Sequence, residues 1–246
     1  MVKKKYLKAP IVEAVIEMRW QDDVPTAELE KIQKKLFSDY PIVENEVTFA
    51  VNVVGESASV SHKPTGRKLK SLDGLNIVLL RPNATGFVRL APYEGWEEFS
   101  KTVKVAWKIV KKIIGHQKLT RIATRYVNRL DIPFPDQKTI VNFDEYLTVG
   151  VDCPKESFPS LENYQVQLNA KFGEGFVGTI RTGTGEPMLI GHTAIILDVD
   201  MSIETSVPQN EKALWLGLER LREMKNKTFE ASITDKSRAL FKGEQK

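Results

Sequence analysis

The sequence predicts an α+β protein built from antiparallel sheets, with three main helices packed on one face. Strand-like segments occur in runs and do not alternate regularly with helices, which argues against a doubly wound parallel fold. Three longer segments with apolar residues at helical spacing interrupt these runs. The chain has 246 residues, of which 41% are hydrophobic, so it can bury a substantial core.

The first 91 residues predict a strand, a helix and a meander. Residues 11–20 alternate, with Ala14, Ile16 and Met18 on one side, which is typical of a half-buried strand. Residues 25–38 carry apolar side chains at helical spacing and predict the first helix. Five short alternating segments then predict an antiparallel meander, at residues 47–54, 58–63, 67–72, 75–81 and 87–91.

The remainder of the chain predicts two further long helices, five strands and a short helix. Residues 95–114 form an amphipathic second helix that Gly115 ends, and residues 120–132 form a strand that Pro133 ends. A proline-rich joint at residues 132–159 contains a short predicted helix at 142–148. Four more strands are predicted at residues 161–172, 175–182, 188–190 and 193–204, and a last helix begins near residue 208 and continues in some form to residue 240.

We divide the chain at residues 1–131 and 132–246, two halves that we expect to form one compact unit. The order of elements suggests that residues 1–115 and residues 120–246 are structural repeats of one another, because each begins with a strand, continues through further strands and ends in a helix. Residue identity between the halves is negligible, so this hypothesis rests on element order alone. It requires the two halves to share a strand topology.

Composition says more about the cellular compartment of the protein than about its binding partner. Lys and Arg number 36 against 32 Asp and Glu, a formal charge of +4, which is far below that of a dedicated nucleic-acid binder. The single cysteine, Cys153, excludes an internal disulfide and fits a reducing cytosol. No uninterrupted apolar run is long enough to span a membrane. We predict a cytoplasmic protein.

Three segments of the chain carry a family resemblance, at residues 9–19, 89–99 and 124–133. At this order and spacing they resemble a sporadically distributed family of uncharacterised prokaryotic proteins of about this length. Residues 228–234 are similar to that family's ending. The resemblance covers essentially the whole chain and implies no activity, cofactor or catalytic residue. The patchy distribution of the family implies a defence, mobile-element or toxin–antitoxin setting, as an association only.

Charged side chains share faces of two predicted strands. Glu13, Glu17 and Arg19 lie on one face of the first strand. Arg121, Arg125 and Arg129 lie on one face of the strand at 120–132. If the two strands share a sheet, these groups form a polar ladder. Two interpretations stay open: cross-strand ion pairs on a solvated face, or an anion-binding groove, since the guanidinium fork matches carboxylates and phosphates.

The leading hypothesis is a non-enzymatic cytosolic protein that recognises a protein partner or a small anionic ligand. Its candidate binding residues are Glu13, Glu17, Arg89, Arg125, Asn128 and Arg129. The alternative is a metal-dependent phosphohydrolase or another nucleotide-acting enzyme. Residues 13–19 are similar to the Glu-x-Glu-x-Lys signature of triphosphate-tunnel enzymes, but the first acid is two places too far away and Arg replaces Lys.

We expect no catalytic constellation, no cofactor and no metal site. The three histidines, His62, His116 and His192, are scattered, and none lies at ligand spacing from another metal-binding residue. Residues 173–178 match Gly-x-Gly-x-x-Gly, but alternating residues follow where a dinucleotide site needs a helix, so we predict a hairpin corner.

Two further partners stay open. Lys101, Lys104, Lys108 and Lys111 follow one side of the second helix, which is by default a solvated face and otherwise a weak nucleic-acid site. The apolar stripe of the last helix and the open edges of an antiparallel sheet also allow a homodimer.

Overall fold

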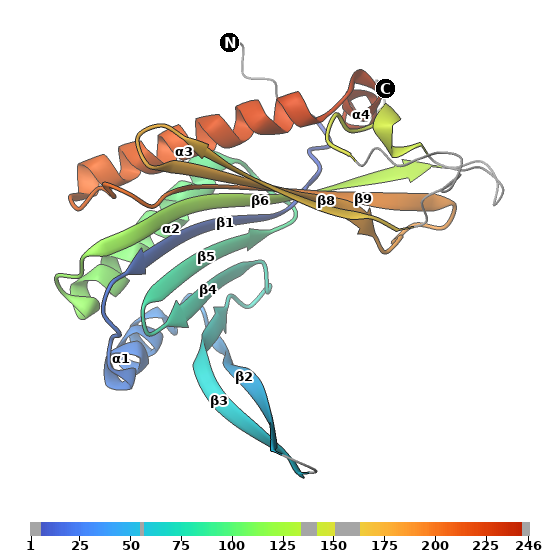
Figure 1. Cartoon of the computed structure of the whole chain (residues 1–246). Helices are drawn as coiled ribbons and strands as arrows, with labels where there is room; N and C mark the ends of the chain where they lie inside the picture. The colour runs from blue at the N-terminus through green and yellow to red at the C-terminus, as the bar shows by residue number, and fades with distance from the viewer. Residues whose placement is uncertain (1–5, 55–56, 134–141, 151–162, 243–246) are drawn as a thin grey trace.

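The computed structural model describes residues 6–54, 57–133, 142–150 and 163–242, with the side chains of residues 48–64 left aside. It shows an α+β fold with one nine-stranded antiparallel sheet (Figure 1). The strands are β1 (Ile11–Trp20), β2 (Ile42–Val54), β3 (Ser57–Lys70), β4 (Asn76–Arg81), β5 (Ala84–Leu90), β6 (Leu119–Pro133), β7 (Gln165–Phe172), β8 (Phe176–Gly185) and β9 (His192–Ile203). The helices are α1 (Thr26–Leu36), α2 (Trp96–Ile114), α3 (Glu211–Ser232), the short α4 (Asp235–Leu240) and the 3₁₀ helix η1 (Phe143–Glu145).

The two halves of the chain share a strand order. The sheet runs β2-β3-β4-β5-β1-β6-β9-β8-β7. In each half the first strand pairs with the last strand of the meander that follows it, β1 with β5 and β6 with β9. The central strands β1 and β6 pair with each other, so the halves form one continuous sheet.

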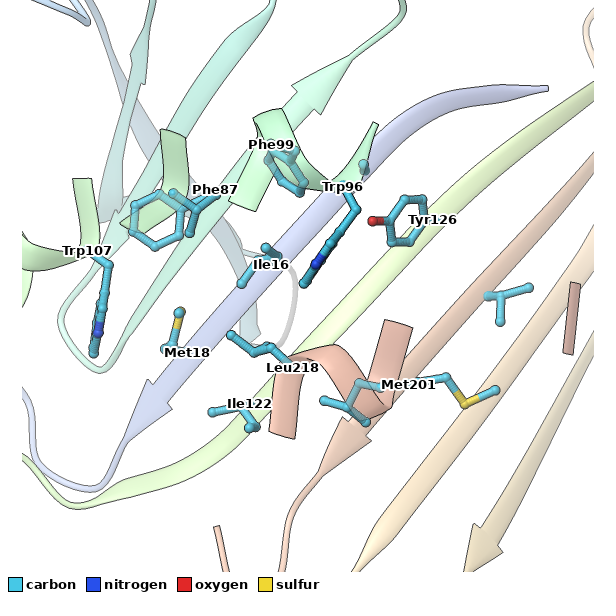
Figure 2. Close-up of a cluster of buried hydrophobic side chains, with 14 of the residues drawn as sticks. Ile16, Met18, Phe87, Trp96, Phe99, Trp107, Ile122, Tyr126, Met201 and Leu218 are labelled. Carbon is cyan, nitrogen blue, oxygen red and sulfur yellow. The ribbon is translucent and has the colours of Figure 1, made fainter. Parts of the chain in front are cut away.

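The core lies on one face of the sheet. Ala14, Ile16 and Met18 of β1 and Ile122 of β6 are buried there, as the alternation predicts. Buried residues of α1, α2 and α3 belong to the same hydrophobic cluster. Figure 2 shows the centre of this cluster, with large side chains from both halves of the chain. We call this side the helix face and the opposite side of the sheet the open face.

The C-terminal helix differs from the prediction because it is interrupted. The α3 helix begins after Asn210, whose side chain accepts a hydrogen bond from the Ala213 amide. It ends before Ile233, which is extended and forms a β-bridge with Leu147. The α4 helix then starts after Thr234, whose side chain accepts a hydrogen bond from the Ser237 amide. A buried extended residue therefore divides the predicted helix in two.

Two of the strand predictions are wrong. Residues 58–63 and 67–72 belong largely to one strand, β3, because the intervening turn signal is a bulge: Glu46 pairs with Gly66 but Val47 pairs with Pro64. Bulges accommodate a proline inside a strand. Residues 188–190 are not a strand but part of the β8–β9 connection, where all three apolar side chains are exposed.

The hairpin predicted at residues 173–178 is confirmed. Phe172 pairs with Phe176 across the β7–β8 turn, and Glu174 and Gly175 have φ angles of 61° and 81°. Cys153 and most of the proline-rich joint lie outside the described residues. Within the described ranges, no helix combines the length and the apolarity that crossing a bilayer requires.

Candidate functional site

A groove of about 500 Å³ lies on the open face and is lined by residues of eight strands, all of the sheet except β7. We call it the open-face groove. Its cationic residues are Arg19, Lys68, Arg81, Arg121, Arg125 and Arg181. Its acidic residues are Glu13, Glu17, Glu46 and Asp200. The pairing of β1 with β6 places the two predicted charged faces side by side, so the polar ladder exists.

Arg121 holds the base of this ladder together. Its guanidinium donates to Glu17 at 2.5 Å, to Asp200 at 3.0 Å and to Glu204 at 3.2 Å. Burial raises the pKa of the Asp200 carboxyl, an effect that the charge of Arg121 partly opposes. With three carboxylate partners, Arg121 has few N–H groups left for a ligand. Its place in the site is structural.

The other arginines lie above their acidic partners. Arg125 donates to Asp198 at 2.9 Å, and Arg181 shares the same carboxylate at 3.3 Å. The Asp198 side chain is 5% exposed, whereas that of Arg125 is 43% exposed. The same order holds for Arg19 (50%) over Glu17 (16%) and for Arg81 (41%) over Glu46 (23%). In each pair the carboxylate is less exposed than the arginine, so buried or half-buried carboxylates support a layer of guanidinium groups that faces solvent.

The arginine heads retain free donors. Arg19, Arg81 and Arg125 each bind their carboxylate through Nε and Nη2. Among the described residues, no partner accepts a hydrogen bond from Nη1 of these three side chains. Because a guanidinium has five N–H donors, each head can still bind an anion while its own ion pair stays intact.

Glu13 is the exception among the acids of the groove. Its side chain forms no hydrogen bond or ion pair with any residue that the structure describes. It lies close enough to Arg125 to help Asp198 raise the pKa of that guanidinium. Near the N-terminal end of β1, the Glu13 carboxylate is therefore a hydrogen-bond acceptor without a donor among the described residues. Arg129, also on the open face, lies beyond the groove lining and donates to Asp131 and to the carbonyl of Glu186.

Two of the predicted binding residues lie on the other side of the sheet. Arg89 is opposite Ala14 in the β1–β5 register, which places it on the helix face, where it donates to the carbonyl of Pro92. Asn128 is 2% exposed and donates to the carbonyl oxygens of Tyr126 and Leu197. Neither residue shares the groove with Glu13, Glu17 and Arg125. Strand parity separates them, because direct partners in a sheet share a face.

The lysines of α2 form no single free surface. The Nζ of Lys104 lies 5.0 Å from the ring centroid of Trp215, and Lys111 forms a 3.0 Å ion pair with Glu211. Lys101 and Lys108 are exposed on the same helix. Two of the four lysines that were predicted to contact phosphate, Lys104 and Lys111, therefore interact with side chains of α3.

Sequence reasoning missed two of the acids on the open face. Asp198 and Asp200 alternate with buried residues on β9 and come to lie beside Arg125, with which Asp200 pairs directly. The signal was the Asp-x-Asp spacing within a strand that is otherwise apolar. Arg181 was missed because its partners come only from neighbouring strands. The described residues include no group of three or more His, Cys, Asp or Glu that could hold a metal ion.

Comparison with known proteins adds little to this site. No family model matches the chain, and no curated protein matches it. Among solved structures, the chain is similar to one described as "KH domains", with 8% sequence identity and a TM-score of 0.21. The alignment covers 94% of this chain and 64% of that one, so the chain spans 64% of that structure's length. A likeness at this TM-score carries no argument about fold or function.

Proposed function

We propose that this protein is a non-enzymatic cytosolic binding protein that holds a small anionic ligand in the open-face groove. The observation that carries the proposal is the layered arrangement, in which solvent-facing arginines lie over buried carboxylates. The acids hold each arginine in position before a ligand arrives, which lowers the entropic cost of binding. A volume of about 500 Å³ is typical of small-molecule sites and favours such a ligand over a protein partner.

Net charge alone does not account for anion binding in this groove. With Asp198 included, six cations face five acids. Affinity must therefore come from the unused Nη1 donors of Arg19, Arg81 and Arg125, which lie above the acids. Hydrogen bonds between guanidinium groups and anions are short and about twice as strong as neutral ones. This arrangement supports the recognition of phosphate or carboxylate groups by geometry.

The test is calorimetric titration with inorganic pyrophosphate, comparing the wild type with Arg19→Gln. We expect the substitution to weaken binding by roughly tenfold or more, as the loss of a charged hydrogen bond implies. Arg19 is suited to the test because Glu17 keeps Arg121 as a partner in its absence. Lys212→Gln, at an exposed position of α3, is the matched control and should bind as the wild type does.

Three results would contradict the proposal. If folded wild-type protein does not bind pyrophosphate, or if Arg19→Gln binds it equally well, the arginine layer is not an anion site. Release of orthophosphate during the titration would instead favour the phosphohydrolase alternative and overturn the non-enzymatic assignment.

A further inference from the structure

Three arginines of the groove form a row across the sheet. In the strand register Arg81 pairs with Ala84, Ala84 pairs with Arg19, and Arg19 pairs with Arg121. The row therefore crosses β4, β5, β1 and β6 on the open face. Directly opposed residues share one face of a sheet, so the two exposed heads, Arg19 and Arg81, lie on the same side of the groove floor.

A second row crosses the same strands and is apolar. Ile77 pairs with Val88, and Val88 pairs with Val15. All three line the groove, but Ile77 and Val88 are each only 6% exposed, so Val15 provides most of the apolar surface that a ligand can contact. The row ends at Arg125, the partner of Val15 on β6. Val15 and Arg19 are four residues apart on β1, which corresponds to about 13 Å along a strand.

Glu13 lies just beyond the apolar row, one alternation along β1 from Val15. A carboxylate without a partner among the described residues repels a second anion and selects a group that donates a hydrogen bond. The groove thus offers, along one strand, cationic donors at Arg19, an apolar surface at Val15 and an acceptor at Glu13.

We infer that the ligand is a nucleoside phosphate, an inference that rests on the anion-binding function proposed above. Its phosphates would bind at the row of arginines, its base would lie on the row of Ile77, Val88 and Val15, and an N–H group of the base would donate to Glu13. The spacing of about 13 Å suits an elongated molecule with an anionic end and a flat apolar end. An alkyl phosphate would fill the first two positions but leave Glu13 unpaired.

The experiment compares inorganic tripolyphosphate, the four common ribonucleoside triphosphates and octyl phosphate by calorimetric titration, without added metal. We expect at least one nucleotide to bind about tenfold more tightly than tripolyphosphate, because it also buries apolar surface. Glu13→Ala should remove much of this advantage without weakening tripolyphosphate binding. Val15→Thr, which keeps the β-branched shape, should reduce the advantage in part. Glu223→Ala, at an exposed position of α3, is the control.

The outcomes separate this inference from the function on which it rests. If tripolyphosphate binds as tightly as every nucleotide, the groove is an anion site and the nucleoside inference is wrong. Equal or tighter binding of octyl phosphate, unaffected by Glu13→Ala, would show a lipid-like ligand and also overturn it. If none of the probes binds to folded protein, the anion-binding function fails as well.

Discussion

At the scale of single residues, Lys225 is the most unusual group outside the groove. It lies on α3, is 6% exposed, and its Nζ lies 3.5 Å from the ring centroid of Tyr126. Burial, together with the nearby charge of Arg222, lowers its pKa to about 7. The Tyr126 phenol beside it is neutral, since burial raises the pKa of that group well above 10.0. The helix face thus contains a lysine that loses its proton near neutral pH.

We expect the stability of the protein to increase with pH above neutrality. Because the Lys225 pKa is about 7 in the folded state and about 10.4 in the unfolded chain, the unfolded state binds more protons between these values. The free energy of unfolding should rise by about 2 kcal/mol between pH 7 and pH 9 from this group alone. Below pH 7 both states carry the proton, and this contribution becomes constant. Urea denaturation across this range measures the effect.

The matched variants are Lys225→Met and Lys227→Met, which replace a buried and an exposed lysine of the same helix. Lys225→Met should stabilise the protein at pH 7 and reduce the slope of stability against pH. Lys227→Met should keep the wild-type slope. An unchanged slope in Lys225→Met would show that the ammonium group is solvated in the folded state.

At the scale of elements, sequence periodicity predicts faces better than it predicts neighbours. Alternation in β1 and β6 correctly separates Ile16 and Ile122 from Glu17 and Arg121. The same parity places Asn128 on the apolar face, so its grouping with Arg125 could have been avoided from the sequence. For Arg89 the register between β1 and β5 decides the face. Register depends on long-range pairing that a single sequence does not show.

Short local signals have the same limit. The Pro-Thr-Gly sequence at residues 64–66 and the Gly-Glu-Gly sequence at residues 173–175 are both typical of turns. The first lies at a bulge inside a strand, whereas the second forms a hairpin turn with two consecutive positive φ angles at residues 174–175. The difference lies in the pairing partners, since β2 continues past the bulge and offers a ladder on both sides. The arginine layer was only half visible for the same reason: Asp198, which supports Arg125 and Arg181, lies on β9, far along the chain.

We expect Gly175→Ala to destabilise the β7–β8 hairpin. Gly175 has a φ of 81°, and a Cβ there would collide with the carbonyl oxygen of Thr205. The left-handed conformation costs a residue with a side chain about 1–2 kcal/mol, and the collision adds to this. Gly173→Ala is the control in the same turn, because a Cβ there has no atom within 4 Å. Thermal unfolding should show a lower Tm for the first variant only, and equal Tm values would contradict the turn geometry.

At the scale of the whole molecule, the two halves meet at the site. The open-face groove takes residues from β1 and β5 on one side and from β6, β9 and β8 on the other. The formal charge of +4 names no partner, and the groove itself is close to neutral. The fold places the carboxylates closer to the sheet and the arginine heads closer to solvent. Neither half alone has all of the cations that line the groove.

We expect the two halves to unfold as one cooperative unit, because one hydrophobic cluster and the β1–β6 pairing span both. Ile16→Ala, at a fully buried position of β1, should cost about 2–5 kcal/mol. Hydrogen–deuterium exchange with mass spectrometry in increasing urea measures the midpoint of unfolding separately for peptides of β4–β5 and of β8–β9. Both midpoints should fall by the same amount, whereas Ile190→Ala, at an exposed position, should move neither. A shift confined to β4–β5 would mean that the halves are independent domains, and that a ligand bound across β1 and β6 must hold them together.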